Sequence, residues 1–152
     1  MSQLARSNRS DARRHSFSII FQLPFHQDES NQAENLAWLK TLYYDYLVEA
    51  PHSRDDEYID RVIWGAYEKQ AQLDGVIQNF LKEWTIDRIN RVDLALMRVA
   101  IYEMLNEHDV PLGVAVNEAV ELAKIFGTDD SPAFINGVLG NVSRHIKETG
   151  RG

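Results

Sequence analysis

Four arginines close to the amino terminus could bind phosphate groups. Residues 1–14 hold a single acidic residue, Asp11, and these arginines give the segment a net charge of +3. Arg9 and Arg13 are four residues apart, so they would share one face of a helix. Guanidinium groups hydrogen-bond phosphate oxygens and can stack on unpaired bases. The segment therefore predicts a nucleic-acid-binding arm, although a solvated terminus with a few charges has the same composition. The four residues are Arg6, Arg9, Arg13 and Arg14.

An aromatic side chain, Phe134, is a second candidate for contact with nucleic acid. It follows the polar loop 127–131 and falls in the first turn of an expected helix. A base could stack on the ring while exposed helix N–H groups meet a phosphate. The alternative is that Phe134 packs in the core, as most single phenylalanines do.

Residues that could carry out enzymatic chemistry do not form a recognisable set. The chain has no cysteine, which excludes disulfides, thiol nucleophiles and cysteine-based zinc sites. Glu118 and Glu121 share a helix face, but no nucleophile or third metal ligand is near them in sequence, so a solvated face is expected. We expect no enzyme activity, no cofactor and no metal. The histidines lack metal-ligand spacing: His15, His26, His52, His108 and His145.

The charge of the chain is divided unevenly. The 152 residues carry a formal net charge of -7, and beyond the basic arm the remainder carries -10. An acidic surface repels phosphate, so the whole balance argues against simple coating of RNA or DNA. No apolar run is long enough to span a membrane and no signal-peptide core follows the polar amino terminus, so we expect a cytoplasmic protein.

Helical periodicity dominates the sequence and predicts an all-α fold. Asp11 and the pair Ser131-Pro132 are expected to begin helices, and Gly127 is expected to end one. The segment 87–105 is apolar on nearly every side and is expected to lie at the centre. The predicted helices span residues 11–22, 31–49, 55–84, 87–105, 112–126 and 131–147, with Gly65 and Gly75 weakening the continuity of the third.

The carboxy-terminal half carries blocks that resemble a known family. In order and spacing, these blocks resemble the signature of the NusB family of transcription antitermination factors, and the segment 12–22 is similar to that family's arginine-led first helix. The resemblance covers roughly residues 9–145 and is strongest from residue 87 onward. The blocks are residues 93–104, 110–111, 116–124 and 134–139.

The resemblance implies one compact all-helical domain, residues 1–152, that acts without catalysis. Two packed helical subdomains are expected at about 9–84 and 85–148, behind a basic arm of residues 1–10. NusB-like proteins bind the boxA element of ribosomal and other RNA as a heterodimer with NusE, the ribosomal protein S10. The pair helps to assemble a complex on RNA polymerase that suppresses termination, notably in rRNA operons.

The resemblance also assigns residues to two surfaces. Phe21, at the family's usual tyrosine position, and Asp93 would contact NusE. Asp11 and Ser18 depart from the family pattern, which bears on the strength of RNA contact. The residues implied to face RNA are Arg6, Arg9, Arg13, Arg14, Asp130 and Phe134.

Three further residues that match the family blocks look like interior positions. If Asn117, Glu121 and Asn136 are buried, each must be hydrogen-bonded or it destabilises the core. We therefore expect a structural role for them.

Two other interpretations remain open. The first is a homodimeric protein–protein adaptor with weak RNA affinity, favoured by Asp11 and by the low overall basicity. The second is the RNA-recognition part of an rRNA cytosine methyltransferase, since some of those enzymes carry a NusB-like domain. This chain has no cofactor-binding βαβ pattern, so it would not methylate by itself.

Overall fold

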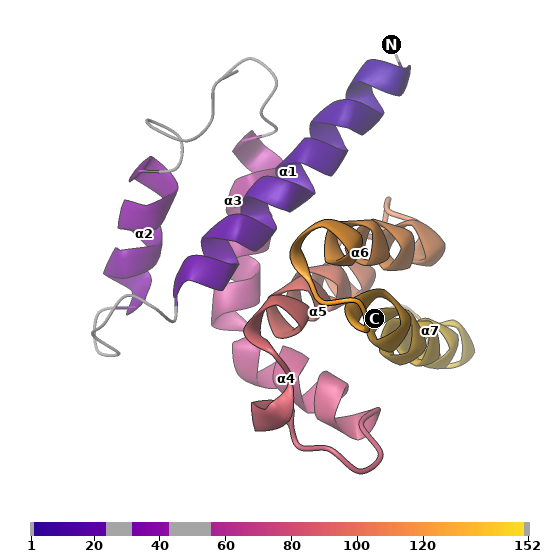
Figure 1. Ribbon diagram of the computed structural model, residues 1–152. Helices are drawn as coiled ribbons and strands as arrows, with labels where there is room; N and C mark the ends of the chain where they lie inside the picture. Colours follow the sequence, from indigo (N-terminus) through magenta and orange to yellow (C-terminus); the bar gives the residue numbers. More distant parts are fainter. Residues whose placement is uncertain (1, 24–31, 43–55, 151–152) are drawn as a thin grey trace. The chain divides into compact units, whose positions relative to one another are not determined.

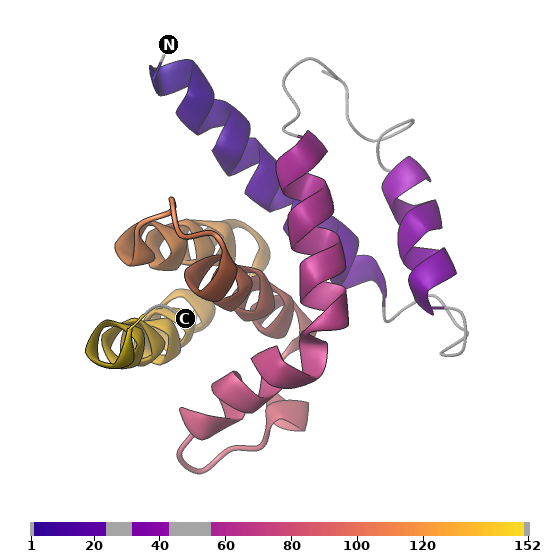
Figure 2. The same cartoon turned by 180° about the vertical axis from the view of Figure 1, so that it is seen from behind.

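The computed structural model describes residues 2–23, 32–42 and 56–150, with side chains from Arg9 and, after the second gap, from Glu57. Within these residues all regular structure is helical, which confirms the all-α prediction (Figures 1 and 2). The helices are α1 (Ser2–Gln22), α2 (Gln32–Leu42), α3 (Asp56–Glu68), α4 (Gln70–Asn79), α5 (Arg91–Asn106), α6 (Leu112–Phe126) and α7 (Ser131–Thr149), with a short 3₁₀ turn, η5 (Ile86–Arg88), before α5.

The chain divides into two compact units, residues 1–64 and 65–152. The first unit holds α1, α2 and most of α3, and the second holds α4 to α7. The sequence analysis placed a subdomain boundary near residue 84. The division falls earlier because α4 packs on α5 and so joins the carboxy-terminal helices.

In the first unit, α1 begins nine residues before the predicted start at Asp11, at Ser2. Asp11 is inside the helix, where its carboxylate lies 3.6 Å from the Arg14 guanidinium one turn later and does not cap the helix. Helix α2 packs on α1 and buries Leu36 and Leu39. The predicted continuation of α2 through residues 43–49 lies outside the described residues.

The long third helix predicted over residues 55–84 is two helices. Helix α3 ends at Glu68 and α4 follows after Lys69, whose backbone (φ -100°, ψ 14°) leaves the helical region. Helix α4 stops at Asn79 because the side-chain amide of Gln78 binds the turn that follows. It donates to the Trp84 carbonyl at 3.0 Å and accepts from the Ile86 N–H at 2.9 Å. Residue 55 lies outside the described part of the chain.

Helix α5 is the centre of the second unit, as the sequence predicted. It contacts α4, α6 and α7, and ten of its residues are buried. Its start is fixed by Asn90, whose side-chain oxygen accepts from the Asp93 N–H at 2.8 Å. Close packing at its far end requires Gly65, because a Cβ there would lie 2.2 Å from the Tyr102 ring.

Helices α6 and α7 lie side by side in the second unit (Figure 1). Helix α6 has the predicted bounds and ends at Gly127, whose N–H donates to the Ala123 carbonyl at 2.9 Å. Helix α7 begins at Ser131, as predicted, but Ser131 is its first residue and not its cap. The Ser131 hydroxyl oxygen instead accepts from the Thr128 N–H at 2.9 Å, which closes the loop. None of the described helices has the length and apolarity to cross a lipid bilayer.

Candidate nucleic-acid interface

The arginines of α1 gather around one aromatic ring in the first unit. The Arg9 guanidinium carbon lies 4.3 Å from the centroid of the Tyr58 ring, and that of Arg13 lies 6.0 Å from it. The two arginines are one turn apart on α1, and Tyr58 belongs to α3. Cations over a ring face are attracted by its quadrupole, so the ring holds both guanidinium groups on one side of α1.

Arg13 is buried in this arrangement. Its exposed fraction is 4%, whereas Arg9 is half-buried. A buried cation needs compensation, which the ring of Tyr58 partly supplies. Of the two arginines predicted to face RNA, Arg9 therefore has an accessible side chain and Arg13 lies inside the unit.

The other two arginines of the arm differ from these. Arg14 is exposed, with its guanidinium 3.6 Å from Asp11. An exposed ion pair of this kind is weak, so Arg14 can exchange its carboxylate partner for another anion. Arg6 falls within α1, outside the residues whose side chains are described.

Sequence reasoning missed a third cation at the same ring. The Arg61 guanidinium lies 6.0 Å from the Tyr58 centroid, and its side chain is exposed. Tyr58 and Arg61 are three residues apart, a spacing that places them on one helix face. That spacing can be read from the sequence, but only the structure shows that Arg61 and Arg9 lie near the same ring. We call Arg9, Arg13, Arg61 and Tyr58 the arginine–tyrosine cluster.

The loop before α7, in the second unit, presents a carboxylate and an aromatic ring. Asp130 is exposed and its side chain makes no capping hydrogen bond, and Phe134 is half-buried in the first turn. Asp129 and Asp130 stabilise the positive end of the α7 dipole. Because these two carboxylates repel phosphate, the loop is suited to a base: the ring can stack and Asp130 can accept from a base N–H.

The two residues assigned to NusE lie in different units. Phe21, in the last turn of α1, is half-buried and stacks on Phe17 with ring centroids 5.9 Å apart. Asp93 is only 4% exposed. Its Oδ2 accepts from the Asn90 side-chain nitrogen at 3.0 Å, which holds the side chain that caps α5, whereas its Oδ1 is buried and has no hydrogen-bond partner within the described residues.

Three polar positions expected in the interior are on the surface. Asn117, Glu121 and Asn136 are all exposed, so the expectation that they are interior was wrong. Glu121 pairs with Lys124 at 2.9 Å, one turn away on α6. The periodicity of α6 and α7 explains the result, since each helix turns its small and aliphatic residues inward, such as Ala119 and Ile135, and these positions outward.

The histidines with described side chains make local contacts. The His108 ring nitrogen Nε2 lies 3.1 Å from the Leu105 carbonyl oxygen, and His145 packs edge-on against Phe80 at 5.8 Å. His15 is buried. In residues 2–23, 32–42 and 56–150 no group of three acidic or histidine side chains could hold a metal ion.

The described part of the chain is an all-helical protein with an arginine-led first helix and a central, largely buried α5. The sequence pattern of the NusB family matches residues 10–144, and the chain belongs to that family. It is 42% identical over 135 residues to the transcription antitermination protein NusB of Acetivibrio thermocellus, covering 88% of this chain and 87% of that protein. It is 36% identical over 143 residues to the NusB protein of Carboxydothermus hydrogenoformans, covering 93% and 96% of the two chains.

Solved structures share the fold. NusB of T. maritima is 32% identical in sequence, with a TM-score of 0.74 and 90% of each chain covered. A complex of the antitermination factors NusB and NusE with dsRNA contains a chain of the same fold, 20% identical, with a TM-score of 0.72. The family expected from the sequence blocks is therefore confirmed.

Proposed function

We propose that this protein binds boxA-type single-stranded RNA together with NusE, the ribosomal protein S10, and helps RNA polymerase to pass terminators, notably in rRNA operons. It acts in the cytoplasm by binding and not by catalysis. The proposal depends on one observation in a chain of the NusB family: Arg9 of α1 and Arg61 of α3 both lie near the Tyr58 ring. The solved complex of a NusB with NusE and dsRNA supports NusE and RNA as partners, and the choice of single-stranded boxA RNA rests on the family resemblance.

On the proposed RNA face, exposure divides the work between the arginines of α1 and Arg61 of α3. Arg9, Arg14 and Arg61 have accessible guanidinium groups that can bind phosphate oxygens. Arg13 positions the Tyr58 ring from inside the unit, and the ring in turn fixes Arg9. Arg6 extends the same arm toward the amino terminus. The acidic remainder of the chain confines RNA to this edge, because phosphate is repelled elsewhere.

The loop before α7 supplies base contact. Phe134 offers a ring for stacking and Asp130 an acceptor, and neither depends on phosphate charge. Recognition would then combine a salt-sensitive contact to the backbone with a salt-insensitive contact to a base.

The NusE surface includes Phe21 and the start of α5. Phe21 is half-buried and offers apolar surface, whereas Asp93 is buried, with one of its two carboxylate oxygens bound by the Asn90 side chain. Asp93 would thus serve the partner by fixing where α5 begins. The acidic body of this chain would also attract a basic ribosomal protein during encounter.

The test compares charge reversal inside and outside the arm. Reversing Arg9→Glu with Arg14→Glu should weaken boxA RNA binding by the NusE-bound protein roughly tenfold or more at low salt, because phosphate contacts release counterions. Arg13 is left intact, since reversing a buried residue would disturb the fold. Fluorescence anisotropy with labelled boxA RNA at two salt concentrations measures the effect.

The matched control is Lys82→Glu with Arg88→Glu. Both residues are exposed, the change in net charge is identical, and within the described residues neither forms an ion pair. If both double variants bind boxA RNA equally well, the proposed RNA face is wrong. A scrambled RNA of the same length separates recognition of boxA from general attraction.

A homodimeric adaptor with weak RNA affinity is the second candidate. It is favoured by the burial of Arg13 and by the Asp11–Arg14 contact, which both reduce the charge available for RNA. Light scattering with and without NusE distinguishes the two. The adaptor predicts a dimer that NusE does not dissociate, whereas the RNA-binding function predicts a one-to-one complex with NusE.

A further inference from the structure

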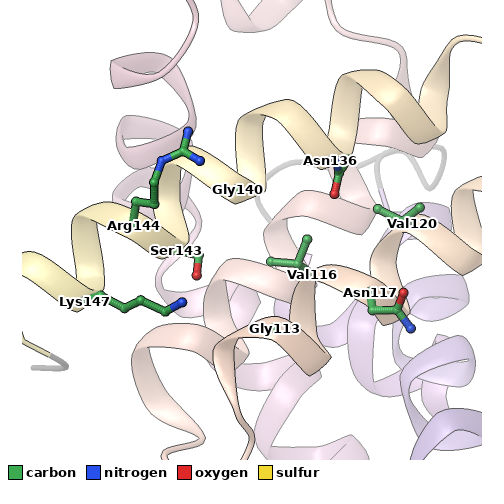
Figure 3. Close-up of a pocket in the computed structure, with 9 residues that line it drawn as sticks. All are labelled: Gly113, Val116, Asn117, Val120, Asn136, Gly140, Ser143, Arg144 and Lys147. Atoms are coloured by element: carbon green, nitrogen blue, oxygen red, sulfur yellow. The ribbon is translucent and has the colours of Figure 1, made fainter.

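An open groove runs between α6 and α7 in the second unit, and it is not part of the proposed RNA face. Its volume is about 380 Å³. From α6 it is lined by a stripe at helical spacing, Gly113, Val116, Asn117 and Val120. Figure 3 shows that Lys147 and Arg144 of α7 lie at one end, with Asn136 and Val120 at the other.

The groove faces away from Phe134. Asn136 follows Phe134 by two residues, which is about 200° around a helix, and Lys147 lies eleven residues after Asn136, close to three full turns. The groove side of α7 is therefore nearly opposite the side that carries Phe134. A molecule in the groove and a base on Phe134 would not compete for the same face of this helix.

The charge of the groove contrasts with that of the chain. Its described lining includes two cations, Arg144 and Lys147, and no acidic residue, although the whole chain carries -7. Arg144 donates to the side-chain oxygen of Asn141, and Lys147 forms no ion pair within the described residues. Both cations are exposed and neither is neutralised by a described carboxylate, so this end of the groove suits an anionic group.

The floor of the groove favours a peptide over RNA. Val116 and Val120 are apolar and half-buried. The lining also includes two glycines, Gly113 and Gly140, which have no side chain to occupy the groove. A Cβ added at either glycine would meet no atom within 4 Å. No described aromatic side chain lines the groove, so a base would find no ring to stack on.

We propose that this groove binds a short acidic segment of a partner protein, with apolar side chains over Val116 and Val120 and carboxylates against Arg144 and Lys147. Asn117 and Asn136 have side-chain amides at the opposite end, where they can hydrogen-bond the segment's backbone. The groove would thus give the protein a contact with a third component while RNA and NusE occupy other surfaces. This inference does not rest on the proposed RNA face.

The test uses a synthetic peptide of alternating glutamate and leucine residues, titrated into ¹⁵N-labelled protein. Saturable amide shifts should be confined to residues of α6 and α7 that line the groove. Raising the salt concentration should weaken binding, and a peptide with lysine in place of glutamate should not bind. Shifts spread over other surfaces, or no saturable binding, would overturn the proposal.

Two variants locate the contact. Gly140→Leu fills the groove, and Arg144→Glu with Lys147→Glu reverses its charge; each should weaken peptide binding roughly tenfold. The matched control is Gly137→Leu, because Gly137 is an equally open glycine of α7 that does not line the groove. Circular dichroism checks that each variant is folded, and the charge variant remains informative if the leucine variant is not.

Two other occupants give different results. If a uridine oligonucleotide displaces the peptide, or if the charge variant loses boxA RNA binding while the peptide never binds, the groove belongs to RNA and the proposal is wrong. If groove signals shift with protein concentration alone, the occupant is a second copy of this chain, which also overturns it.

Discussion

The two regions proposed to contact RNA are built on opposite principles. In the first unit, the arginines gather around a fully buried ring, that of Tyr58, and one of them, Arg13, is itself buried. In the second unit, the loop before α7 is held by short-range hydrogen bonds, and its candidate residues Asp130 and Phe134 stay accessible. The arginine–tyrosine cluster therefore stabilises the fold and also offers charge. In the loop, Thr128 and Ser131 make the stabilising hydrogen bond, and other residues are the candidates for RNA contact.

This difference shows that an arginine assigned to RNA by family resemblance, Arg13, can be part of the core. Substituting Arg13 or Tyr58 would alter stability and RNA binding together, because the ring that compensates the buried cation also positions Arg9. Substituting Phe134 or Asp130 should alter RNA binding with little effect on the fold. The contrast can be tested by measuring unfolding and RNA binding on the same variants.

The largest expected effect is that of Tyr58→Ala. The ring is fully buried and contacts two arginines of α1, so its removal should lower the free energy of unfolding by about 3–5 kcal/mol. Urea unfolding followed by circular dichroism measures the loss. In the folded fraction, boxA RNA binding by the NusE-bound protein should also weaken, since Arg9 loses its support.

Tyr58→Phe is the control, because it keeps the ring and removes only the hydroxyl. It should retain RNA binding and most of the stability. An alanine variant as stable as the unsubstituted protein would mean that the arginine–tyrosine cluster is not structural, and the comparison between the two units would fail.

Much of the second unit could be predicted because its signals are local. Helix α6 has the bounds that its periodicity and Gly127 indicate, and a Cβ at Gly127 would lie 2.6 Å from the Ser131 side chain, so a glycine fits there. The start of α7 was placed correctly at Ser131, but the role of that serine was not. The cap position and the first helical position are neighbouring residues, and a serine suits both. The sequence alone therefore does not tell whether the Ser131 hydroxyl caps the helix or closes the preceding loop.

The first unit was harder because its decisive contacts join distant segments. Asp11 has the residue type of a helix cap, yet it lies inside α1 and contacts Arg14. The spacing of Arg9 and Arg13 correctly indicates a shared side of α1. The burial of Arg13 depends on Tyr58 of α3, and no pattern near residue 13 reveals that neighbour. Family resemblance identified the arm but not which arginine is enclosed.

An intermediate effect is expected for Phe134→Ala. Loss of one stacked base should weaken boxA RNA binding by the NusE-bound protein by about 1–2 kcal/mol, roughly tenfold, with an unchanged dependence on salt. Arg9→Ala should instead reduce the slope of log K against log salt by about 1, because one phosphate contact is lost. Anisotropy titrations across a salt series measure both quantities.

Phe80→Ala controls for the removal of an aromatic side chain. Phe80 is also half-buried and belongs to the second unit, but it packs on His145 outside the loop before α7. RNA binding should be unchanged in this variant. A salt slope that falls with Phe134→Ala, or an equal loss with Phe80→Ala, would contradict the assignment of base contact to the loop.

The smallest expected effect is a gain. Asp11→Asn removes the carboxylate that lies 3.6 Å from Arg14, and because an exposed pair contributes about 0.2–1 kcal/mol, boxA RNA should bind two- to threefold more tightly, by rough estimate. Glu121→Gln makes the same charge change in an equivalent exposed pair of the second unit, where it frees Lys124. Equal gains in the two variants would show that net charge alone matters. A gain confined to Asp11→Asn would place Arg14 against RNA. The two variants have the same net charge and each frees one cation, so a difference between them must come from a local contact with RNA.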